Sequence, residues 1–362
     1  MFGLIAYINY KRENRRKYIW FGFSFILFIL SCLSKATAVV FPFSLILINF
    51  WFCNYNDKKS IRDSIKEAIS LKNLLLLIPF LLVSFVIGML AYRLQSGDNF
   101  LGILDLSKVT PDVINKIGPF TIWHRFEIGC YGFITYLVKF FIPVHLSSFY
   151  PYPSPREFDS ETLSTLIKFA PAALFLILVP VVLSVRRTKL YVFGIGFYFI
   201  SIVLVLQFVS VGYAIIADRY SYLPYIGLSF IIAGLIVKGT KTRKYLLFFI
   251  STCLIILMIF LSRKQTEVWS NTETLWSNVI NKFPHVEISR RSRGKYYSKI
   301  ALRTKNAGEK KRYEEKALTD FKEAIASGSK NSEVYEGAGV IYGSKGDLKS
   351  AILCLNNAIA LD

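Results

Sequence analysis

Long apolar runs bounded by clusters of Lys and Arg constrain this chain more than any other feature of its sequence. About 20 apolar residues cross the hydrocarbon core of a bilayer as a helix. Membrane-spanning helices are therefore predicted at residues 18–33, 38–52, 74–92, 166–185, 190–216, 222–237 and 245–261. A shorter run, residues 1–10, ends at "KRENRRK" and resembles the last part of another span. Together with the mean hydropathy of +0.43, these runs predict a multi-pass integral membrane protein.

The basic clusters predict how these spans are oriented. Cytoplasmic loops of membrane proteins carry an excess of Lys and Arg. Four such clusters occur, at residues 11–17, 57–66, 186–189 and 238–244. If all four are cytoplasmic, Lys35 and Asp218 both lie at the external face.

The same orientation predicts which apolar stretch does not span. An even number of crossings must join the second and third basic clusters, so the apolar stretch 126–143 is expected to lie in the outer interface. It carries Glu127 and Lys139, which suit that position. Residues 93–165 then form one large external loop, and the chain after residue 261 is external as well.

The C-terminal residues, 263–362, follow a 34-residue register. The positions that carry this register are Tyr335, Ala338, Gly339, Tyr342, Gly346, Ala351, Leu355 and Ala358. Ala317, Phe321 and Ala324 stand one period earlier, and "TKNAGEKKRYE" is an insertion into that earlier repeat. Small residues at these positions let paired helices approach closely, as in tetratricopeptide repeats. We expect a repeat α-solenoid that binds protein or peptide, in which the register residues themselves are structural.

The charge, cysteine and histidine patterns exclude several other classes. The net charge of +20 lies in short clusters between apolar runs, so it indicates contact with anionic lipid and not with nucleic acid. The five cysteines form no C-x-x-C pair, and the three histidines are too scattered to predict a metal site. Common soluble-enzyme motifs, such as a Walker loop or H-E-x-x-H, do not occur.

Polar residues at the predicted external face are the candidates for chemistry. Lys35 in "LSKATAVVFP" either extends to the lipid headgroups or holds a phosphate. In "ADRYSYLP", Asp218 and Arg219 either form an ion pair that fixes the loop or hold a ligand. In the second interpretation Arg219 grips a phosphate bidentately and Asp218 orients it or a sugar hydroxyl. Tyr220 and Tyr222 are expected to lie in the headgroup layer.

A second group of polar residues lies in the predicted external loop. "TIWHRFEIG" offers His124 and Arg125 as residues that support the site. Lys139, in "YLVKFFIPVHLSSFYPYP", is expected to reach lipid headgroups. The "YPYP" run predicts a rigid extended turn, because each proline restrains the residue before it.

Four motifs in this order resemble one family. "LSKATAVVFPFSLILINFW", "YLVKFFIPVHLSSFYPYP", "ADRYSYLPYIGL" and Trp269 to Trp276 before the repeats are similar to the transmembrane and tetratricopeptide-repeat-containing O-mannosyltransferases and their bacterial relatives. These are membrane glycosyltransferases of fold type C. The resemblance implies a polyprenyl-phosphate sugar as donor, an outward-facing site, and Lys35 and Arg219 near the donor phosphate. Many relatives have an acidic residue after the lysine, whereas this chain has Ala36.

The resemblance also implies where the catalytic acid lies. Enzymes of this fold type carry it in the first external loop, and the parity of the crossings places Met1 in the fourth span of such an enzyme. The principal acid is then expected N-terminal to this chain, which would be a fragment or a truncated homologue. Asp98, Asp105 and Asp112 in the large loop are alternatives. No cofactor is assigned, and a divalent metal ion stays an open alternative.

The combined prediction is an all-α chain with two parts. Residues 1–262 form a polytopic membrane helix bundle, and residues 263–362 form an extracytoplasmic tetratricopeptide solenoid. The predicted function is transfer of a sugar from a polyprenyl-phosphate carrier to an external protein or glycan, at a bacterial cytoplasmic membrane. The alternatives are a non-catalytic repeat scaffold for envelope assembly and an enzyme similar to O-antigen ligases, whose donor carries a diphosphate.

Overall fold

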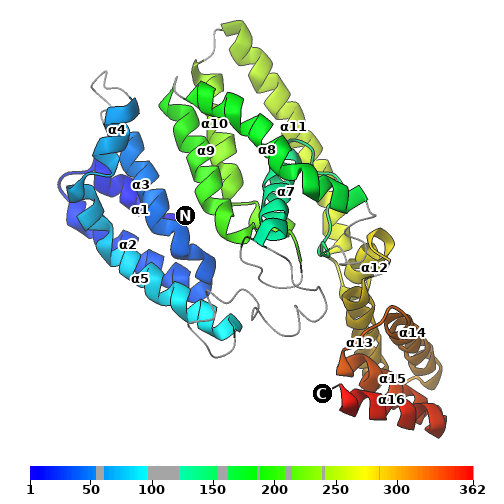
Figure 1. Ribbon diagram of the computed structural model, residues 1–362. Coiled ribbons are helices and arrows are strands. Elements are labelled where there is room, and N and C mark those ends of the chain that lie inside the picture. The colour runs from blue at the N-terminus through cyan, green and yellow to red at the C-terminus, as the bar shows by residue number, and fades with distance from the viewer. Residues whose placement is uncertain are drawn as a thin grey trace. The chain divides into compact units, whose positions relative to one another are not determined.

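The described chain is helical throughout its regular structure. The computed structural model describes residues 1–53, 61–96, 122–152, 162–185, 188–206, 208, 214–238, 241–284 and 286–361. No β-strand occurs within these ranges, so the all-α prediction is confirmed for them (Figure 1). Asp98, Asp105 and Asp112 lie outside the described residues.

The chain divides into two compact units. The first comprises Met1–Ile142 and Tyr152–Ser251, and the second comprises Pro143–Pro151 and Thr252–Asp362. The division falls close to the predicted boundary at residue 262. It differs in two respects, because it falls between Ser251 and Thr252 and because the short segment Pro143–Pro151 belongs to the second unit.

Among the residues that the structure describes, three helices are long and apolar enough to cross a membrane, judged by length and composition. They are α2 (Lys17–Ser34), α5 (Leu71–Ser96) and α11 (Lys241–Val268). Large apolar side chains such as Phe23 and Phe85 are more than half exposed on them, which suits helices that face lipid. The other four predicted spans fall on the apolar helical segments Ala36–Phe52, Ser164–Leu178, Lys189–Val205 and Pro224–Lys238.

The N-terminal helices of the first unit share an aromatic core. This group consists of α1 (Phe2–Arg12), α2, the 3₁₀ helix η1 (Ala36–Val40), α3 (Phe41–Phe52), α4 (Ile61–Ala68) and α5. Phe80 of α5 is fully buried and contacts Phe25 edge-on at 5.2 Å and Phe41 in a stacked geometry at 5.8 Å. Tyr7 of α1 donates a hydrogen bond to the side-chain oxygen of Asn49 of α3 at 3.0 Å, which links these two helices inside the core.

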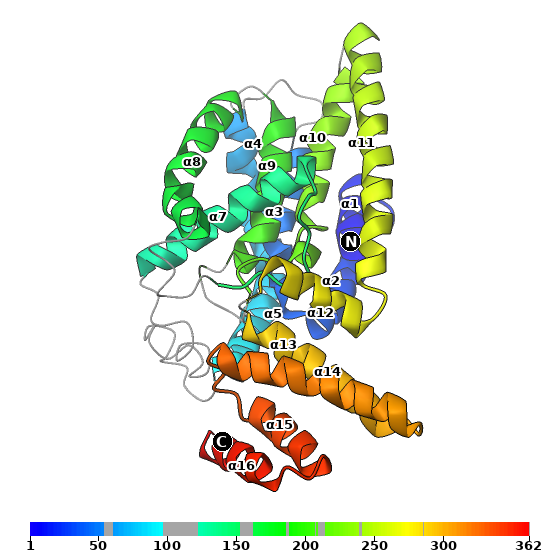
Figure 2. The same ribbon diagram turned by 90° about the vertical axis from the view of Figure 1, so that its right-hand side faces the viewer.

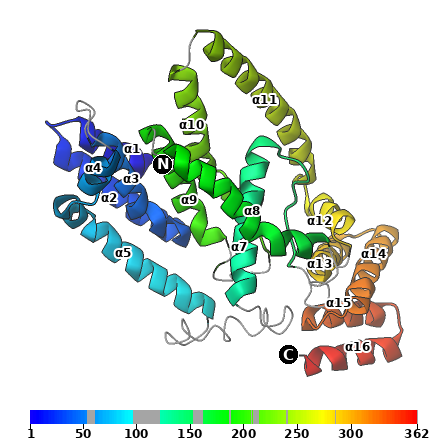
Figure 3. The ribbon, with the colours of Figure 1, turned by 45° about the horizontal axis from the view of Figure 1, so that its top comes forward.

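The remaining helices of the first unit are α7 (Ile122–Phe141), α8 (Thr162–Val185), α9 (Lys189–Ile202) and α10 (Pro224–Lys238). Helix α8 packs against α7 (Figure 3), and α9 lies beside α10 (Figure 1). Two glycines allow the second pair to meet closely. A Cβ at Gly194 would lie 2.6 Å from the Gly227 carbonyl oxygen, and a Cβ at Gly227 would lie 2.3 Å from that of Gly194. Neither position therefore accepts a side chain without separating the helices.

One predicted span is shorter than expected. The sequence predicts a helix over residues 190–216, but α9 ends at Ile202 and a single 3₁₀ turn, η3 (Val203–Val205), follows. The stretch after Ile202 is rich in valine, whose β-branched side chain lowers helix propensity. The chain therefore leaves the helix early, and residues 214–217 approach the next turn without being helical.

The second unit consists of antiparallel helix pairs. Its helices after α11 are α12 (Thr272–Lys282), α13 (Glu287–Arg303), α14 (Ala307–Ala326), α15 (Ser332–Ser344) and α16 (Leu348–Ala360). Helix α13 packs along α14, and α15 packs along α16 (Figure 2). The insertion predicted at residues 304–314 lengthens α14, since its residues from Ala307 onward are helical.

The register residues build the contacts of these pairs. Among them, Ala338, Gly339, Ala351 and Ala358 are buried, and Tyr335 and Tyr342 are half-buried. Gly346, with φ of +80°, forms the turn before α16. Leu355, another register residue, packs on Gly339 and is 38% exposed.

The segment Pro143–Pro151 packs on α12. Lys282 of α12 donates a hydrogen bond to the Leu146 carbonyl, and the rings of Tyr150 and Phe283 meet edge-on at 6.2 Å. The Tyr150 hydroxyl accepts from the Ser147 N–H at 2.7 Å. These contacts fix the segment as a structured part of the second unit.

Candidate functional site

The candidate site is built on the turn Ala217–Tyr220 of the first unit. Ala217 is extended, with φ of −146° and ψ of 124°, and the 3₁₀ turn η4 (Asp218–Tyr220) follows it. The Ala217 carbonyl accepts from the Tyr220 N–H at 2.9 Å, and the Ser221 hydroxyl donates to the Asp218 carbonyl at 2.7 Å. The turn leads into α10, whose first residue is Pro224, a position that suits proline.

Tyrosines hold this turn against the helices. The Tyr136 hydroxyl of α7 accepts from the Ala217 N–H at 2.8 Å and donates to the Ala217 carbonyl at 3.0 Å. The Tyr225 hydroxyl of α10 donates to the Tyr136 carbonyl at 2.7 Å. The Tyr198 hydroxyl of α9 donates to the Phe133 carbonyl at 3.0 Å. Tyr136 therefore fixes the backbone just before Asp218, while Tyr225 and Tyr198 join α10 and α9 to α7.

Asp218 forms an ion pair, but with a residue far away in the sequence. Its Oδ1 lies 2.7 Å from Lys139 Nζ of α7, and the two side chains are 26% and 11% exposed. The interpretation in which Lys139 reaches lipid headgroups is therefore wrong. A buried ammonium group is stable only when it is paired, and Asp218 supplies that partner.

Lys35 and Arg219 meet at the ring of Tyr220. Lys35 ends α2, and its Nζ lies 4.8 Å from the ring centroid. The Arg219 Cζ lies 5.0 Å from the same centroid. Both residues are exposed, and among the described residues neither forms an ion pair. Two cations thus share one aromatic ring, which attracts each of them while their donors stay directed to solvent.

The other predicted site residues lie apart from this group. Helix α7 rises about 1.5 Å per residue, so His124 and Arg125 lie about 20 Å along the helix from Lys139. Arg125 is 6% exposed. The structure therefore does not bring this pair to Lys35 and Arg219. Tyr222 is 67% exposed, two residues beyond the shared ring.

Sequence reasoning missed the residues that position the site. Tyr136 and Lys139 are three residues apart on α7, so they lie on one face of that helix and contact the consecutive residues Ala217 and Asp218. A lysine and a tyrosine at this spacing within an apolar helix give a signal that a polar partner lies opposite. The signal does not say which residue that partner is.

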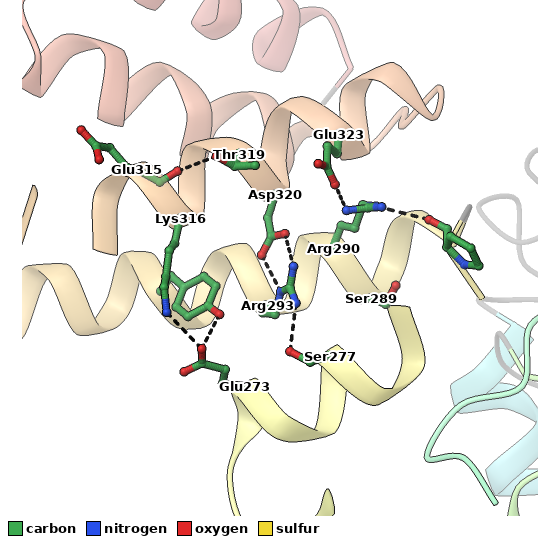
Figure 4. Close-up of polar contacts among 12 residues, drawn as sticks. Glu273, Ser277, Ser289, Arg290, Arg293, Glu315, Lys316, Thr319, Asp320 and Glu323 are labelled. Atoms are coloured by element: carbon green, nitrogen blue, oxygen red, sulfur yellow. Dashed lines mark hydrogen bonds and ion pairs between the residues drawn. The ribbon is translucent and has the colours of Figure 1, made fainter. Parts of the chain in front are cut away.

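The second unit contains a network of polar contacts between its helices (Figure 4). Arg293 of α13 donates to both carboxylate oxygens of Asp320, at 2.9 and 2.7 Å, and to the Ser277 hydroxyl at 2.9 Å. Asp320 is 2% exposed, and this bidentate contact raises the pKa of Arg293 above its ordinary value. The network joins α12, α13 and α14, which indicates a structural role.

A second contact of this network changes the acidity of a glutamate. The Tyr297 hydroxyl donates to Glu273 Oε1 at 2.7 Å, and Lys316 Nζ lies 3.1 Å from the same oxygen. The hydrogen bond from Tyr297 lowers the pKa of Glu273, with a further contribution from Lys316. Burial raises the pKa of Tyr297. Across the described residues, no group of three His, Cys, Asp or Glu side chains is arranged to hold a metal ion.

The site can therefore bind an anion. An exposed guanidinium offers paired N–H donors to phosphate oxygens, and a nearby ammonium adds a point charge. Comparison with protein-family models, curated proteins and solved structures finds no match for this chain.

Proposed function

We propose that this protein is a membrane glycosyltransferase that transfers a sugar from a polyprenyl-phosphate carrier to an external protein or glycan acceptor. The observation that carries the proposal is the convergence of Lys35 and Arg219 on the ring of Tyr220, at 4.8 and 5.0 Å. Both cations are exposed and have donors available for a phosphate. The order of motifs that resembles fold type C glycosyltransferases agrees with this assignment.

The chemistry of the transfer explains why cations are required. The acceptor oxygen attacks the anomeric carbon, the bond from that carbon to the phosphate oxygen breaks, and polyprenyl phosphate leaves with the bonding electrons. A base removes the acceptor proton, and within this chain Asp98, Asp105 and Asp112 are the candidates for that base. Negative charge builds on the departing phosphate, and Lys35 and Arg219 would stabilise it. Asp218 Oδ1 already accepts from Lys139, so we assign Asp218 to the structure of the turn and not to proton transfer.

The lipid part of the donor suits the surroundings of Lys35. This residue ends α2, which is long and apolar enough to span a membrane. Leu30 and Leu33, close to that end, are 56% and 70% exposed. A prenyl chain could lie along such a surface while its phosphate meets the two cations. A polyprenyl-phosphate headgroup is therefore a better match than a fully soluble sugar phosphate.

The proposal includes the finer organisation of the chain. We infer a multi-pass protein in which the apolar segments around α3, α8, α9 and α10 cross the membrane beside the three longer helices, and a bacterial cytoplasmic membrane as its location. The helix pairs α13–α14 and α15–α16 would be tetratricopeptide repeats on the external side that select the acceptor. Burial of Ala338, Ala351 and Ala358 at register positions supports this interpretation.

The test is transfer of a radiolabelled sugar in membranes that contain the full chain. Wild-type protein is expected to move label from a polyprenyl-monophosphate mannose to a protein acceptor, and Arg219→Gln is expected to lower the rate at least tenfold. Lys66→Gln, at an exposed lysine of α4 outside both proposed binding regions, is the control with unchanged transfer. Label transfer from a diphosphate-linked glycan only would favour the ligase alternative. If no sugar is transferred but the helix pairs α13–α14 and α15–α16 still bind a partner protein, the result would favour the non-catalytic repeat scaffold.

A further inference from the structure

An aspartate next to the proposed phosphate-binding arginine creates a conflict that the structure resolves. Asp218 directly precedes Arg219, and an unpaired carboxylate there would be the nearest counter-ion for the guanidinium. Asp218 instead pairs with Lys139, at 2.7 Å. Arg219 forms no ion pair with a described residue and stacks on Tyr220.

We propose that Lys139 is a positioning residue that holds Asp218 away from Arg219, so that Arg219 stays available to the phosphate. This role rests on the proposed function. Lys139 acts through Asp218 and does not touch the ligand. The charges of Lys139 and Asp218 cancel in their ion pair. The two positive charges that remain near the turn belong to the exposed residues Lys35 and Arg219, and they match the negative charge of a phosphate.

The geometry of the turn explains how the two neighbours separate. Consecutive residues of a 3₁₀ turn point about 120° apart, since three residues complete one turn. Asp218 therefore faces α7 while Arg219 faces solvent, in agreement with their exposure. Tyr136, three residues before Lys139 on the same face of α7, holds Ala217 by two hydrogen bonds. One face of α7 thus fixes both the backbone and the charge that precede Arg219.

The opposite arrangement would weaken phosphate binding. Without Lys139, the Asp218 carboxylate loses the ammonium group at 2.7 Å, and a charge-assisted hydrogen bond to the adjacent Arg219 would compete with the ligand. Such a bond corresponds to a loss of affinity on the order of tenfold. Removing the charge of Asp218 at the same time removes the competitor. The role therefore predicts that a second substitution rescues the first.

The experiment measures binding of farnesyl phosphate to the full chain in detergent, with farnesol as the uncharged probe. Lys139→Met is expected to lower the affinity for farnesyl phosphate about tenfold. Lys139→Met with Asp218→Asn is expected to return to within about threefold of wild type, and Lys139→Arg to keep wild-type affinity. Lys295→Met, which breaks the exposed pair with Glu333, is the control without effect.

The outcomes separate this role from the proposed function. A double variant as weak as Lys139→Met, in a protein that still prefers farnesyl phosphate to farnesol, would overturn the positioning role alone. A wild-type protein with equal affinity for both probes would overturn the phosphate site and this role with it. If Lys139→Met does not fold, the affinities of the double variant and of Lys139→Arg for farnesyl phosphate still test the positioning role. That role requires both variants to bind farnesyl phosphate nearly as tightly as wild type.

Discussion

Replacement of Tyr136 by Phe removes one oxygen atom that contacts the turn twice. The hydroxyl accepts from the Ala217 N–H at 2.8 Å and donates to the Ala217 carbonyl at 3.0 Å. The ring of Tyr136 is fully buried, so the Phe ring fills the same space. The substitution therefore tests the hydrogen bonds and not the packing.

The expected loss of stability follows from what remains of these contacts. The Ala217 carbonyl keeps its bond from the Tyr220 N–H at 2.9 Å, whereas the Ala217 N–H loses the Tyr136 hydroxyl. Ala217 is 3% exposed, so water does not replace the missing acceptor. An unpaired buried donor costs about 1–3 kcal/mol, and the bond lost by the carbonyl adds about 1 kcal/mol. The unfolding free energy is expected to fall by about 2–4 kcal/mol.

The site is expected to weaken together with the fold. A turn that must be ordered again on binding costs on the order of 1 kcal/mol per residue fixed, so affinity for farnesyl phosphate is expected to fall roughly tenfold. Tyr198→Phe is the matched control, because Tyr198 is as deeply buried but bonds the Phe133 carbonyl and not the turn. It is expected to lower the melting temperature slightly and to leave affinity unchanged. Wild-type affinity in Tyr136→Phe would refute the reasoning.

Two further predictions concern the second unit. A Cβ at Gly337 would lie 2.6 Å from the Phe321 ring, whereas one at Gly343, on the same helix, would meet an ordinary contact at 4.0 Å. Gly337→Ala is thus expected to destabilise by about 1–3 kcal/mol and Gly343→Ala to stabilise by up to about 1 kcal/mol, measured by thermal unfolding; the reverse order would contradict the packing. The pKa of Glu273 is lower in the folded protein than the ordinary glutamate value of 4.5. Its contact with Tyr297 therefore stabilises the second unit fully at pH values above 4.5, and this stabilisation is lost as the pH falls through the pKa of the folded state. Hydrogen exchange in α12 and α13 should show that loss in wild type and not in Glu273→Gln.

Features that depend on local sequence could be predicted. Helices α2 and α5 follow from long apolar runs, because a lipid-facing helix needs little besides length and composition. The pair α15–α16 follows from small residues at fixed spacing, such as Gly339 and Ala351, which must be small wherever two helices touch. The 34-residue register therefore suffices to predict that these small residues are buried.

Features that depend on distant contacts could not be predicted. The pair of Lys139 and Asp218 joins residues 79 positions apart, and the bonds of Tyr136 to Ala217 join residues 81 apart. Each residue alone is compatible with several partners, so its role becomes visible only when the fold selects one. The early end of α9 has a similar cause, since hydropathy continues past Ile202 although helix propensity falls.

The most direct test of the account is equilibrium binding of farnesyl phosphate, farnesol and inorganic phosphate to the full chain. Wild-type protein is expected to bind farnesyl phosphate more tightly than either other probe, because the site needs both a phosphate and a prenyl chain. Lys35→Gln and Arg219→Gln are each expected to lower that affinity about tenfold without changing the affinity for farnesol. Equal affinity of wild type for farnesyl phosphate and farnesol, or unchanged affinity in both variants, would contradict the account.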